Sequence, residues 1–349
     1  MGQIFKNNKK QIYLKKILIV GTGAIALRHY KNILKIDKNY RIDFFTKKKK
    51  LKIRDYLTNS KLINNFKEVI QTKYYAVIIC NPSSHHMKFA IPFAKKGSNL
   101  YIEKPISSEN ISETKRLFNL SKKKKITLQV GYNLLFLNSL KHLNELIKKN
   151  KLGKIKIVKV DTGYYLPFWR KKDYKKTVSS RKELGGGVLL ELSHELNYLI
   201  QLFDLPKSIQ ANIGKISELK LNVEDYANLF LKFKKGIVCS CNLDFINKNY
   251  TRKLEIISDK GNFIWDFKKN IIRKSIINLN SKNRNLKIIK FSKKDSYYLS
   301  IKYFLDLCEQ KKSNPDIKNA INTLRLVIYA KKSALLNKSI MLRKKDFDI

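Results

Sequence analysis

The hydrophobic residues of the first 130 positions come in short apolar runs that alternate with longer amphipathic stretches. Strands are predicted at 17–20, 40–45, 74–80, 99–102 and 126–130. Helices are predicted after the first run and at 85–96 and 108–123. Strands that are apolar throughout and alternate with helices are typical of a parallel sheet covered on both faces. We therefore expect an α/β domain over 16–131, preceded by a short basic extension at 1–15.

The pattern changes after residue 131, where apolar and polar residues alternate along consecutive segments. Strands of this half-exposed kind are predicted at 155–161, 208–213, 226–233, 237–245, 252–258 and 261–266. Helices are predicted at 139–149, 296–311 and 319–336, and the polar, basic stretch 280–294 is expected to be a hairpin arm or loop. Consecutive alternating strands indicate an open, mostly antiparallel sheet. We expect a second, α+β domain over 132–349.

A glycine motif follows the first predicted strand and opens the first predicted helix. It consists of Gly21, Thr22, Gly23, Ala24, Ile25 and Ala26. Gly21 permits a tight turn, Gly23 has no side chain to hold a phosphate away, and Ala26 is small enough for close helix–strand packing. The free N–H groups of the helix start attract a pyrophosphate. The motif predicts a doubly wound Rossmann domain that binds NAD(P), and a tight turn without a ligand is the alternative.

The end of the second strand bears on the choice of cofactor. An acidic residue there bonds the ribose of NAD, but the strand ends in Thr46 and Lys47, and Asp43 lies within it. A hydroxyl and an ammonium group suit a 2′-phosphate better, which favours NADP. Alternatively, the run 47–50 is only a solvated stretch of charge.

Charge and cysteine content exclude few classes of protein. The chain has 349 residues and a formal net charge of +47, but its basic residues are spread along the whole length. With its many Ile and Asn residues, this looks like drift under AT-rich coding, so we expect a solvated cationic surface and no specific nucleic acid. No run is long enough to span a membrane, and residues 1–16 lack the apolar core of a signal peptide. The four cysteines form no metal site, and reduced thiols in a cytoplasmic protein are expected.

Several motifs together resemble the Gfo/Idh/MocA oxidoreductase family. The first half carries the glycine motif, Asn81-Pro82 with His86, and Glu103-Lys104-Pro105. The second half carries Gly131-Tyr132-Asn133, Trp169, and a segment from Gly185-Gly-Gly to His194-Glu-Leu-Asn197. The resemblance covers about residues 16–340. It implies an NAD(P)-dependent dehydrogenase or reductase that acts on a hydroxyl or carbonyl of a sugar, sugar nucleotide or cyclitol, with a role in surface-glycan precursor synthesis.

Three residues are expected to carry the chemistry. Lys104 lies just past a strand end, where an ammonium group can polarise the reacting oxygen, and the resemblance gives it that role. His194 is the acid/base candidate. Glu191 lies three residues before His194, hence on the same side of a helix, and is expected to orient the imidazole and raise its pKa. A surface lysine and a core histidine are the alternatives.

The remaining expectations concern binding. Asn81, Pro82, His86, Glu103 and Lys104 are expected to contact the cofactor, and Tyr132, Trp169, Arg181 and His194 the substrate. The glycines at 185–187 are expected to let the backbone approach either ligand closely.

Two positions depart from the family pattern. Leu135 stands where many relatives carry Arg, and Asn197 stands where this branch often has Asp. These departures motivate an alternative function, a dinucleotide-binding regulatory protein with weakened catalysis. The second sheet is expected to form a homo-oligomer.

Overall fold

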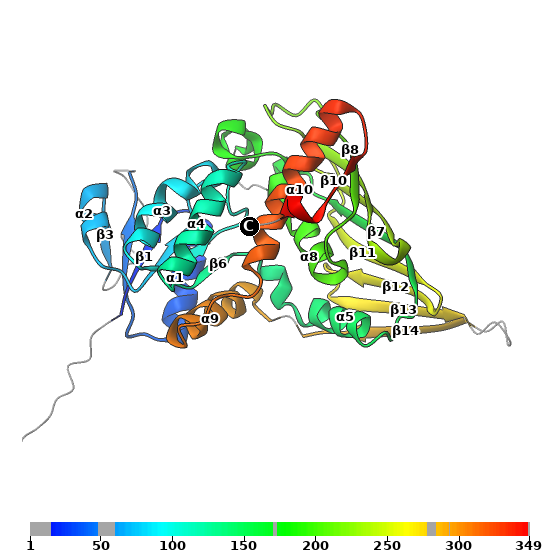
Figure 1. Ribbon diagram of the computed structural model, residues 1–349, viewed down its shortest axis with the longest axis horizontal. Coiled ribbons are helices and arrows are strands. Elements are labelled where there is room, and N and C mark those ends of the chain that lie inside the picture. Colours follow the sequence, from blue (N-terminus) through cyan, green and yellow to red (C-terminus); the bar gives the residue numbers. More distant parts are fainter. Residues whose placement is uncertain (1–14, 48–59, 170–172, 278–283, 293, 348–349) are drawn as a thin grey trace, which may run out of the picture.

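The computed structural model describes residues 15–47, 60–169, 173–277, 284–292 and 294–347. They form two sheets that stand side by side, with helices between and around them (Figure 1). Of the expected basic extension at 1–15, only Lys15 lies within the described residues.

The first sheet has six parallel strands, as the apolar runs predict. The strands are β1 (Lys16–Val20), β2 (Arg41–Phe45), β3 (Lys61–Ile63), β4 (Ala76–Ile79), β5 (Asn99–Ile102) and β6 (Leu128–Val130). Their order is β3-β2-β1-β4-β5-β6, and every neighbouring pair is parallel. This is the doubly wound arrangement, in which ligands bind where the strand order reverses, between β1 and β4.

Helices cover both faces of this sheet because its strands are apolar on both sides. Leu18 and Val20 face a core with α3 (His86–Lys95) and α4 (Ile111–Lys123), whereas Ile17 and Ile19 face α1 (Ala24–Ile36). The second helix on the α1 face is α9 (Ser296–Glu309), whose Phe304 packs edge-on against Tyr101. Although α9 belongs to the C-terminal half of the chain, it completes the core of the N-terminal domain.

The second sheet has nine strands in the order β14-β13-β12-β11-β7-β10-β9-β8-β15. The strands are β7 (Ile155–Gly163), β8 (Ser208–Gly214), β9 (Tyr226–Lys232), β10 (Val238–Asp244), β11 (Thr251–Ser258), β12 (Gly261–Asp266), β13 (Ile271–Ile277), β14 (Arg284–Lys290) and β15 (Ile340–Met341). All pairs are antiparallel except β7–β10, which is parallel. The expected open, mostly antiparallel sheet is confirmed.

Helices cover only one face of this sheet. They are α5 (Asn138–Lys148), α8 (His194–Phe203) and α10 (Ile317–Leu336), and they lie on the side that faces the N-terminal domain (Figure 1). Trp265 of β12 is fully buried on this side, packs edge-on against Tyr198 and donates to the Ser139 hydroxyl at 2.9 Å. Along the chain, the short helices α6 (Leu166–Trp169) and α7 (Val188–Glu191) come between β7 and α8.

Short elements account for most differences from the expected secondary structure. The pattern gave no sign of β3 or of α2 (Phe66–Gln71), which are three and six residues long. The stretch 280–294, expected to be an arm or loop, contains strand β14, which pairs with β13; residues 278–283 and 293 lie outside the described part. Both strands mix Lys and Arg with Ile and place apolar residues in adjacent pairs, such as Ile271-Ile272 and Ile288-Ile289, so neither shows the alternation that predicts a half-exposed strand.

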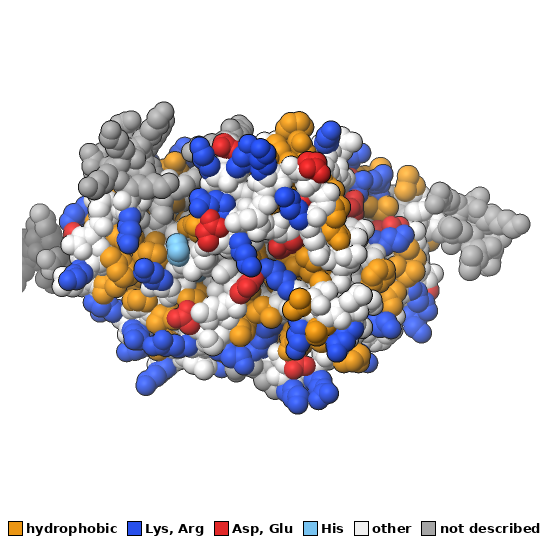
Figure 2. Space-filling view, turned by 90° about the horizontal axis from the view of Figure 1, so that it is seen from above, with side chains coloured by type: hydrophobic (Ala, Val, Ile, Leu, Met, Phe, Trp, Pro, Cys, Tyr) orange, Lys and Arg blue, Asp and Glu red, His pale blue; other side chains and the backbone are white. Residues whose placement is uncertain are grey.

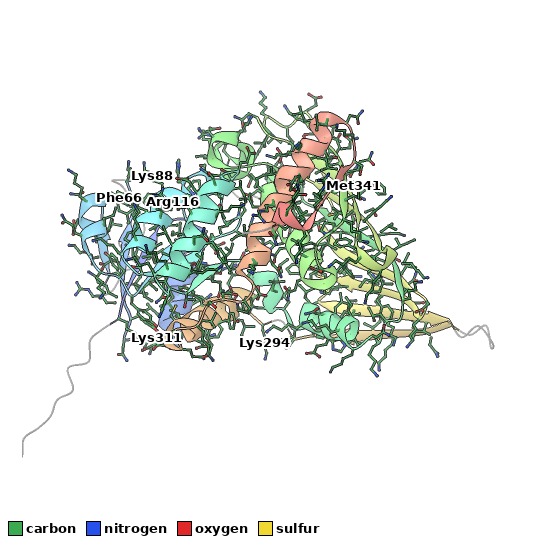
Figure 3. The ribbon with its side chains drawn as sticks, viewed as in Figure 1. Phe66, Lys88, Arg116, Lys294, Lys311 and Met341 are labelled. Carbon is green, nitrogen blue, oxygen red and sulfur yellow. The ribbon has the colours of Figure 1, made fainter. Side chains whose placement is uncertain are left out.

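Basic side chains are scattered over the surface. Lys and Arg occur over both domains on the face in Figure 2, and Lys88, Arg116 and Lys311 project from the outer surface of the N-terminal domain in Figure 3. All four cysteines are unpaired. Among the described helices, none is both long and apolar enough to cross a membrane.

Candidate functional site

The turn between β1 and α1 has room for a phosphate group. Gly21 has φ +105°, and a Cβ there would lie 3.2 Å from the Cys80 carbonyl, so a larger residue is excluded. A Cβ on Gly23 would meet nothing within 4 Å. Gly23 is the N-cap of α1, and the first turn contains no acidic side chain. The N–H groups of this turn are therefore available to an anion.

Asn81 supplies a second polar group at the same edge of the sheet, directly after β4. Its Oδ1 and Nδ2 atoms are buried and have no hydrogen-bond partner among the described residues. An unsatisfied buried amide is costly unless a ligand or water bonds it. Gly23 and Asn81 together fit a dinucleotide.

His86 holds this loop in place through both of its ring nitrogens, and its expected contact with the cofactor stays a prediction. Its Nε2 lies 2.8 Å from the Asn81 carbonyl oxygen and its Nδ1 lies 3.0 Å from that of Pro105. Burial lowers the pKa of this imidazole. His86 thus joins the loop after β4 to the turn that carries Lys104.

Glu103 is also engaged with the protein. Its Oε1 lies 2.6 Å from Nε2 of His29, a fully buried residue of α1 that packs edge-on against Tyr101. Glu103 therefore makes a positioning contact between α1 and the end of β5, and its expected contact with the cofactor stays a prediction. The sequence motifs gave His29 no role.

Among the residues described at the end of β2, none offers a carboxylate to a ribose. Asp43 is fully buried, where it pairs with Lys16 at 2.8 Å and accepts from Tyr74 at 3.1 Å. Thr46 is mostly buried and its N–H donates to Ile63, whereas Lys47 is exposed. The rest of the run 47–50 lies outside the described residues.

Lys104 joins the two domains. Its ammonium donates to the backbone oxygen of Glu191 at 2.7 Å, and the Glu191 carboxylate lies 3.7 Å away. Lys104 follows β5 and Glu191 ends α7, so the contact joins the N-terminal domain to the segment 185–197 of the C-terminal domain, called the catalytic segment below.

His194 begins α8 in the same region, but Glu191 does not raise its pKa as expected. Burial lowers the pKa of His194 well below its usual range, and the charges of Lys104 and Arg252 lower it further. Its Nδ1 is buried without a hydrogen-bond partner among the described residues, and its ring packs edge-on against Tyr132 at 5.5 Å. Packing, not a carboxylate on Nδ1, holds the imidazole.

The residue after His194 forms a buried ion pair. The next residue, Glu195, is fully buried and lies 2.8 Å from Nε of Arg252, and it also accepts from Thr162 at 3.0 Å. Burial alone would lower the pKa of Arg252, but the Glu195 carboxylate raises it. We did not predict this pair, since nothing in the sequence connects residues so far apart.

The three glycines before α7 approach protein atoms closely, and their expected approach to a ligand stays a prediction. A Cβ on Gly185 would lie 2.1 Å from Oγ of Ser83, and one on Gly187 would lie 2.4 Å from the Glu224 carboxylate. Ser83 follows the Asn81 loop and donates to the Gly185 carbonyl at 3.3 Å. The glycines therefore let the catalytic segment dock against the cofactor loop.

The expected substrate contacts fall in different places. Tyr132 is buried beside His194, and Trp169 stacks on Tyr164 with ring centroids 4.6 Å apart. Arg181 is exposed and pairs with Glu183 at 2.5 Å, a surface arrangement that does not support its expected role.

Both departures from the family pattern are accommodated by packing. Asn197 is buried and its amide donates to Thr323 of α10 at 3.1 Å. Leu135 is partly buried against the core. Neither side chain takes part in the contacts of Lys104 and His194.

A Rossmann sheet with a glycine turn, and a lysine and a histidine brought together from two domains, define a dinucleotide-dependent oxidoreductase. The chain belongs to the Gfo/Idh/MocA oxidoreductase family. Residues 15–132 match the family's NAD-binding Rossmann fold and residues 144–342 match its C-terminal alpha/beta domain.

Two curated relatives illustrate the family. The chain is 24% identical over 270 residues to a myo-inositol 2-dehydrogenase of Thermotoga maritima, which covers 72% of this chain and 75% of the relative. It is 23% identical over 233 residues to the scyllo-inositol 2-dehydrogenase (NADP(+)) IolW of Bacillus subtilis, which covers 65% and 62%.

Solved structures share the fold at low sequence identity. A levoglucosan dehydrogenase in complex with NADH superposes with a TM-score of 0.83 at 14% identity, over 94% of this chain and 99% of that chain. A putative NADPH-dependent oxidoreductase from Desulfitobacterium hafniense superposes with a TM-score of 0.81 at 14% identity, over 94% and 97%.

The His29–Glu103 contact predicts coupling between α1 and the Lys104 turn. We expect His29→Phe to lower the free energy of unfolding by about 1–3 kcal/mol, because it leaves the Glu103 carboxylate without its partner. Adding Glu103→Leu should restore part of the loss, and urea denaturation of both single variants and the double variant measures the coupling. His142→Phe, at a half-buried histidine outside the site, is the matched control. Strictly additive losses would contradict the coupling.

Proposed function

We propose that the protein transfers a hydride between NAD(P) and a hydroxyl or carbonyl group of a sugar, sugar nucleotide or cyclitol. The observation that carries the proposal is the bond from Lys104 of one domain to the backbone of Glu191 in the other, three residues before His194, at the sheet edge where Gly23 and the unpartnered Asn81 amide lie. Asn81 and the N-terminus of α1 would hold the dinucleotide, whose nicotinamide supplies a hydride acceptor or donor when bound.

The side chains divide the remaining work. In the oxidative direction, Lys104 polarises the substrate oxygen and stabilises the negative charge that develops on it. The hydroxyl proton goes to His194 while the hydride leaves the same carbon, so a carbonyl forms. Because Nδ1 of His194 is sealed inside the protein, Nε2 is the nitrogen that exchanges the proton.

The surroundings of His194 favour the neutral imidazole, which is the form that accepts a proton in the oxidative direction. Its lowered pKa keeps the imidazole neutral, and so able to accept a proton, at pH values below the usual histidine range. Glu191 accepts from Lys104 through its backbone and places the ammonium, so we give it a positioning role.

The relatives support the class of substrate. Three of the proteins named above act on inositols or levoglucosan, according to their names, and these molecules present several secondary hydroxyl groups. A screen should therefore include myo-inositol, scyllo-inositol, levoglucosan, free aldoses and the sugar nucleotides that serve as surface-glycan precursors. The regulatory alternative loses support, because Asn197 serves helix packing and Lys104 and His194 retain a shared site.

Removing either catalytic residue separates chemistry from cofactor binding. We expect Lys104→Met and His194→Gln to lower kcat by about 10²–10⁴ on any substrate found in the screen, since each removes a proton-transfer or charge-stabilising group. NADH or NADPH binding, followed by nicotinamide fluorescence, should change less than threefold. The acid limb of oxidative kcat/KM should lie below pH 6.5. Retained turnover in both variants, or a limb at or above pH 6.5, would refute these roles.

For the cofactor, we propose a preference for NADP that depends on Lys47, whose exposed ammonium follows β2 where no free carboxylate stands. We expect Lys47→Ala to weaken NADPH binding about tenfold and NADH binding little, in titrations at physiological salt. Lys95→Ala, at an exposed lysine of α3, is the matched control. Equal effects on both cofactors would show that Lys47 acts only through general charge.

For the assembly, we propose that the outer face of the nine-stranded sheet pairs with a second copy of the chain. Helices leave this face open, and its exposed apolar residues lie on the adjacent strands β7, β10 and β9 and on the edge strand β14. These residues are Ile157, Phe230, Val238, Leu286 and Ile288. A mixed apolar and charged face of this kind suits an isologous contact.

A charge placed on the outer sheet face tests the assembly. We expect Phe230→Lys, at a side chain that is 65% exposed, to shift the protein from dimer toward monomer at micromolar concentration, as measured by light scattering after size exclusion. Leu335→Lys, on α10 and away from the sheet, should leave the mass unchanged. A wild-type monomer at these concentrations would dismiss the proposal.

A further inference from the structure

A second ammonium group crosses between the two domains, in the direction opposite to that of Lys104. Lys331 belongs to α10 of the C-terminal domain, and its Nζ donates to Oε1 of Glu109 at 2.6 Å. Glu109 lies in the loop between β5 and α4, the same loop that begins with Glu103 and Lys104. Each domain therefore extends one lysine to the other, and both contacts involve the β5–α4 loop.

The Lys331 ammonium also faces a carboxylate of its own domain. Oε1 of Glu224, a residue that precedes β9, lies 4.0 Å from Nζ of Lys331. The side chain of Glu224 is 14% exposed, whereas that of Glu109 is 53% exposed. Burial raises the pKa of Glu224, and the charge of Lys331 is the strongest of the effects that oppose this rise. One ammonium group is thus shared by one carboxylate from each domain.

Glu224 holds the start of α7 in the catalytic segment. Its main-chain oxygen accepts from the N–H of Val188 at 3.2 Å, and the N–H of Leu189 stabilises its carboxylate. A Cβ on Gly187 would collide with this carboxylate, so the two groups are in close contact. Gly187 is the N-cap of α7 and has no side chain that could bond the first N–H groups of the helix. Glu224 supplies this cap from another part of the chain.

These contacts close a ring that runs through both domains. Helix α7 begins at the Glu224 cap and ends at Glu191, whose backbone oxygen accepts from Lys104 at 2.7 Å. The β5–α4 loop leads from Lys104 to Glu109, and Lys331 connects Glu109 back to Glu224. Because α7 is only four residues long, a shift at its start also moves Glu191. The position of the Lys104 ammonium therefore depends on the contacts of Lys331.

We infer that Lys331, Glu109 and Glu224 form an interdomain latch that positions the catalytic segment, and through it the Lys104 ammonium. The inference rests on the proposed function, which gives Lys104 its role in the reaction. The three residues act through α7 and the β5–α4 loop, so they are positioning residues. In a chain with 27 acidic residues against 74 basic ones, two of the acidic residues meet at this one lysine.

Hydrogen exchange of the backbone amides in 187–191, followed by mass spectrometry, tests the latch without a substrate. We expect Lys331→Met and Glu224→Gln to speed this exchange about three- to tenfold, because each removes one charge of the pair and leaves the other partly buried. Lys331→Arg keeps the charge and should stay within about twofold of the wild-type rate. Lys332→Met, at the exposed neighbouring lysine of α10, is the matched control.

Two results of the exchange measurement would overturn the latch. The first is an unchanged rate in 187–191 for both Lys331→Met and Glu224→Gln. The second is a rate that rises equally in 187–191, α10 and β9, because that would indicate a general loss of stability and no specific hold on the catalytic segment.

Turnover tests whether the latch positions Lys104. We expect Lys331→Met and Glu224→Gln to lower kcat about three- to tenfold on a substrate found in the screen, with the affinity for NADH or NADPH changed less than about twofold. In the Lys104→Met background, Glu224→Gln should lower kcat no further, because the group that it positions is then missing.

The kinetic results separate the latch from the proposed function. Losses that multiply in the Lys104→Met/Glu224→Gln double variant, or faster exchange with unchanged kcat, would overturn the positioning role. If the wild-type protein turns over no substrate of the screen, the proposed function fails, and the exchange rates in 187–191 then decide for or against the latch by themselves.

Discussion

The contact between Lys104 and Glu191 is the constraint on which the site depends. Lys104 ends the parallel sheet of one domain, and Glu191 precedes α8 of the other, so a single ammonium group connects both halves. The contact requires the two domains to lie close, and Gly185 allows this because a side chain there would collide with Ser83 of the N-terminal domain. The position of the Lys104 ammonium therefore depends on how the two domains pack against each other.

Much of the fold could be predicted from the sequence because hydrophobic periodicity records burial. Strands buried on both faces appear as continuous apolar runs, and half-exposed strands alternate, so both sheets were visible. The pattern could not show which distant elements pack together. Helix α9 covers the N-terminal sheet through Phe304, and the parallel β7–β10 pair joins strands separated by two others in the chain. Such contacts depend on three-dimensional shape, which local periodicity does not contain.

For the candidate site too, the local features could be predicted from the sequence and the long-range contacts could not. The glycine turn and Lys104 follow strand ends, where the chemistry is fixed by local backbone geometry, and both were predicted. The partners of the acidic residues were not, because spacing along a helix shows only which side chains can meet. Glu191 lies one turn from His194 but contacts Lys104, and Glu103 pairs with His29, 74 residues away. A carboxylate pairs with the nearest available cationic group, and the tertiary fold determines which group that is.

The distribution of acidic residues also explains how a chain of net charge +47 can hold an electrically balanced site. With 27 acidic residues against 74 basic ones, most lysines have no carboxylate near them and must remain in water. Buried or partly buried cations have little contact with water, and several are paired with a carboxylate. Examples are Arg252 with Glu195 and Lys16 with Asp43. The excess charge is therefore confined to the surface. Burial is the largest cause of the lowered pKa of His194, and the nearby charges of Lys104 and Arg252 lower it further, so the surface charge is a poor guide to what the site binds.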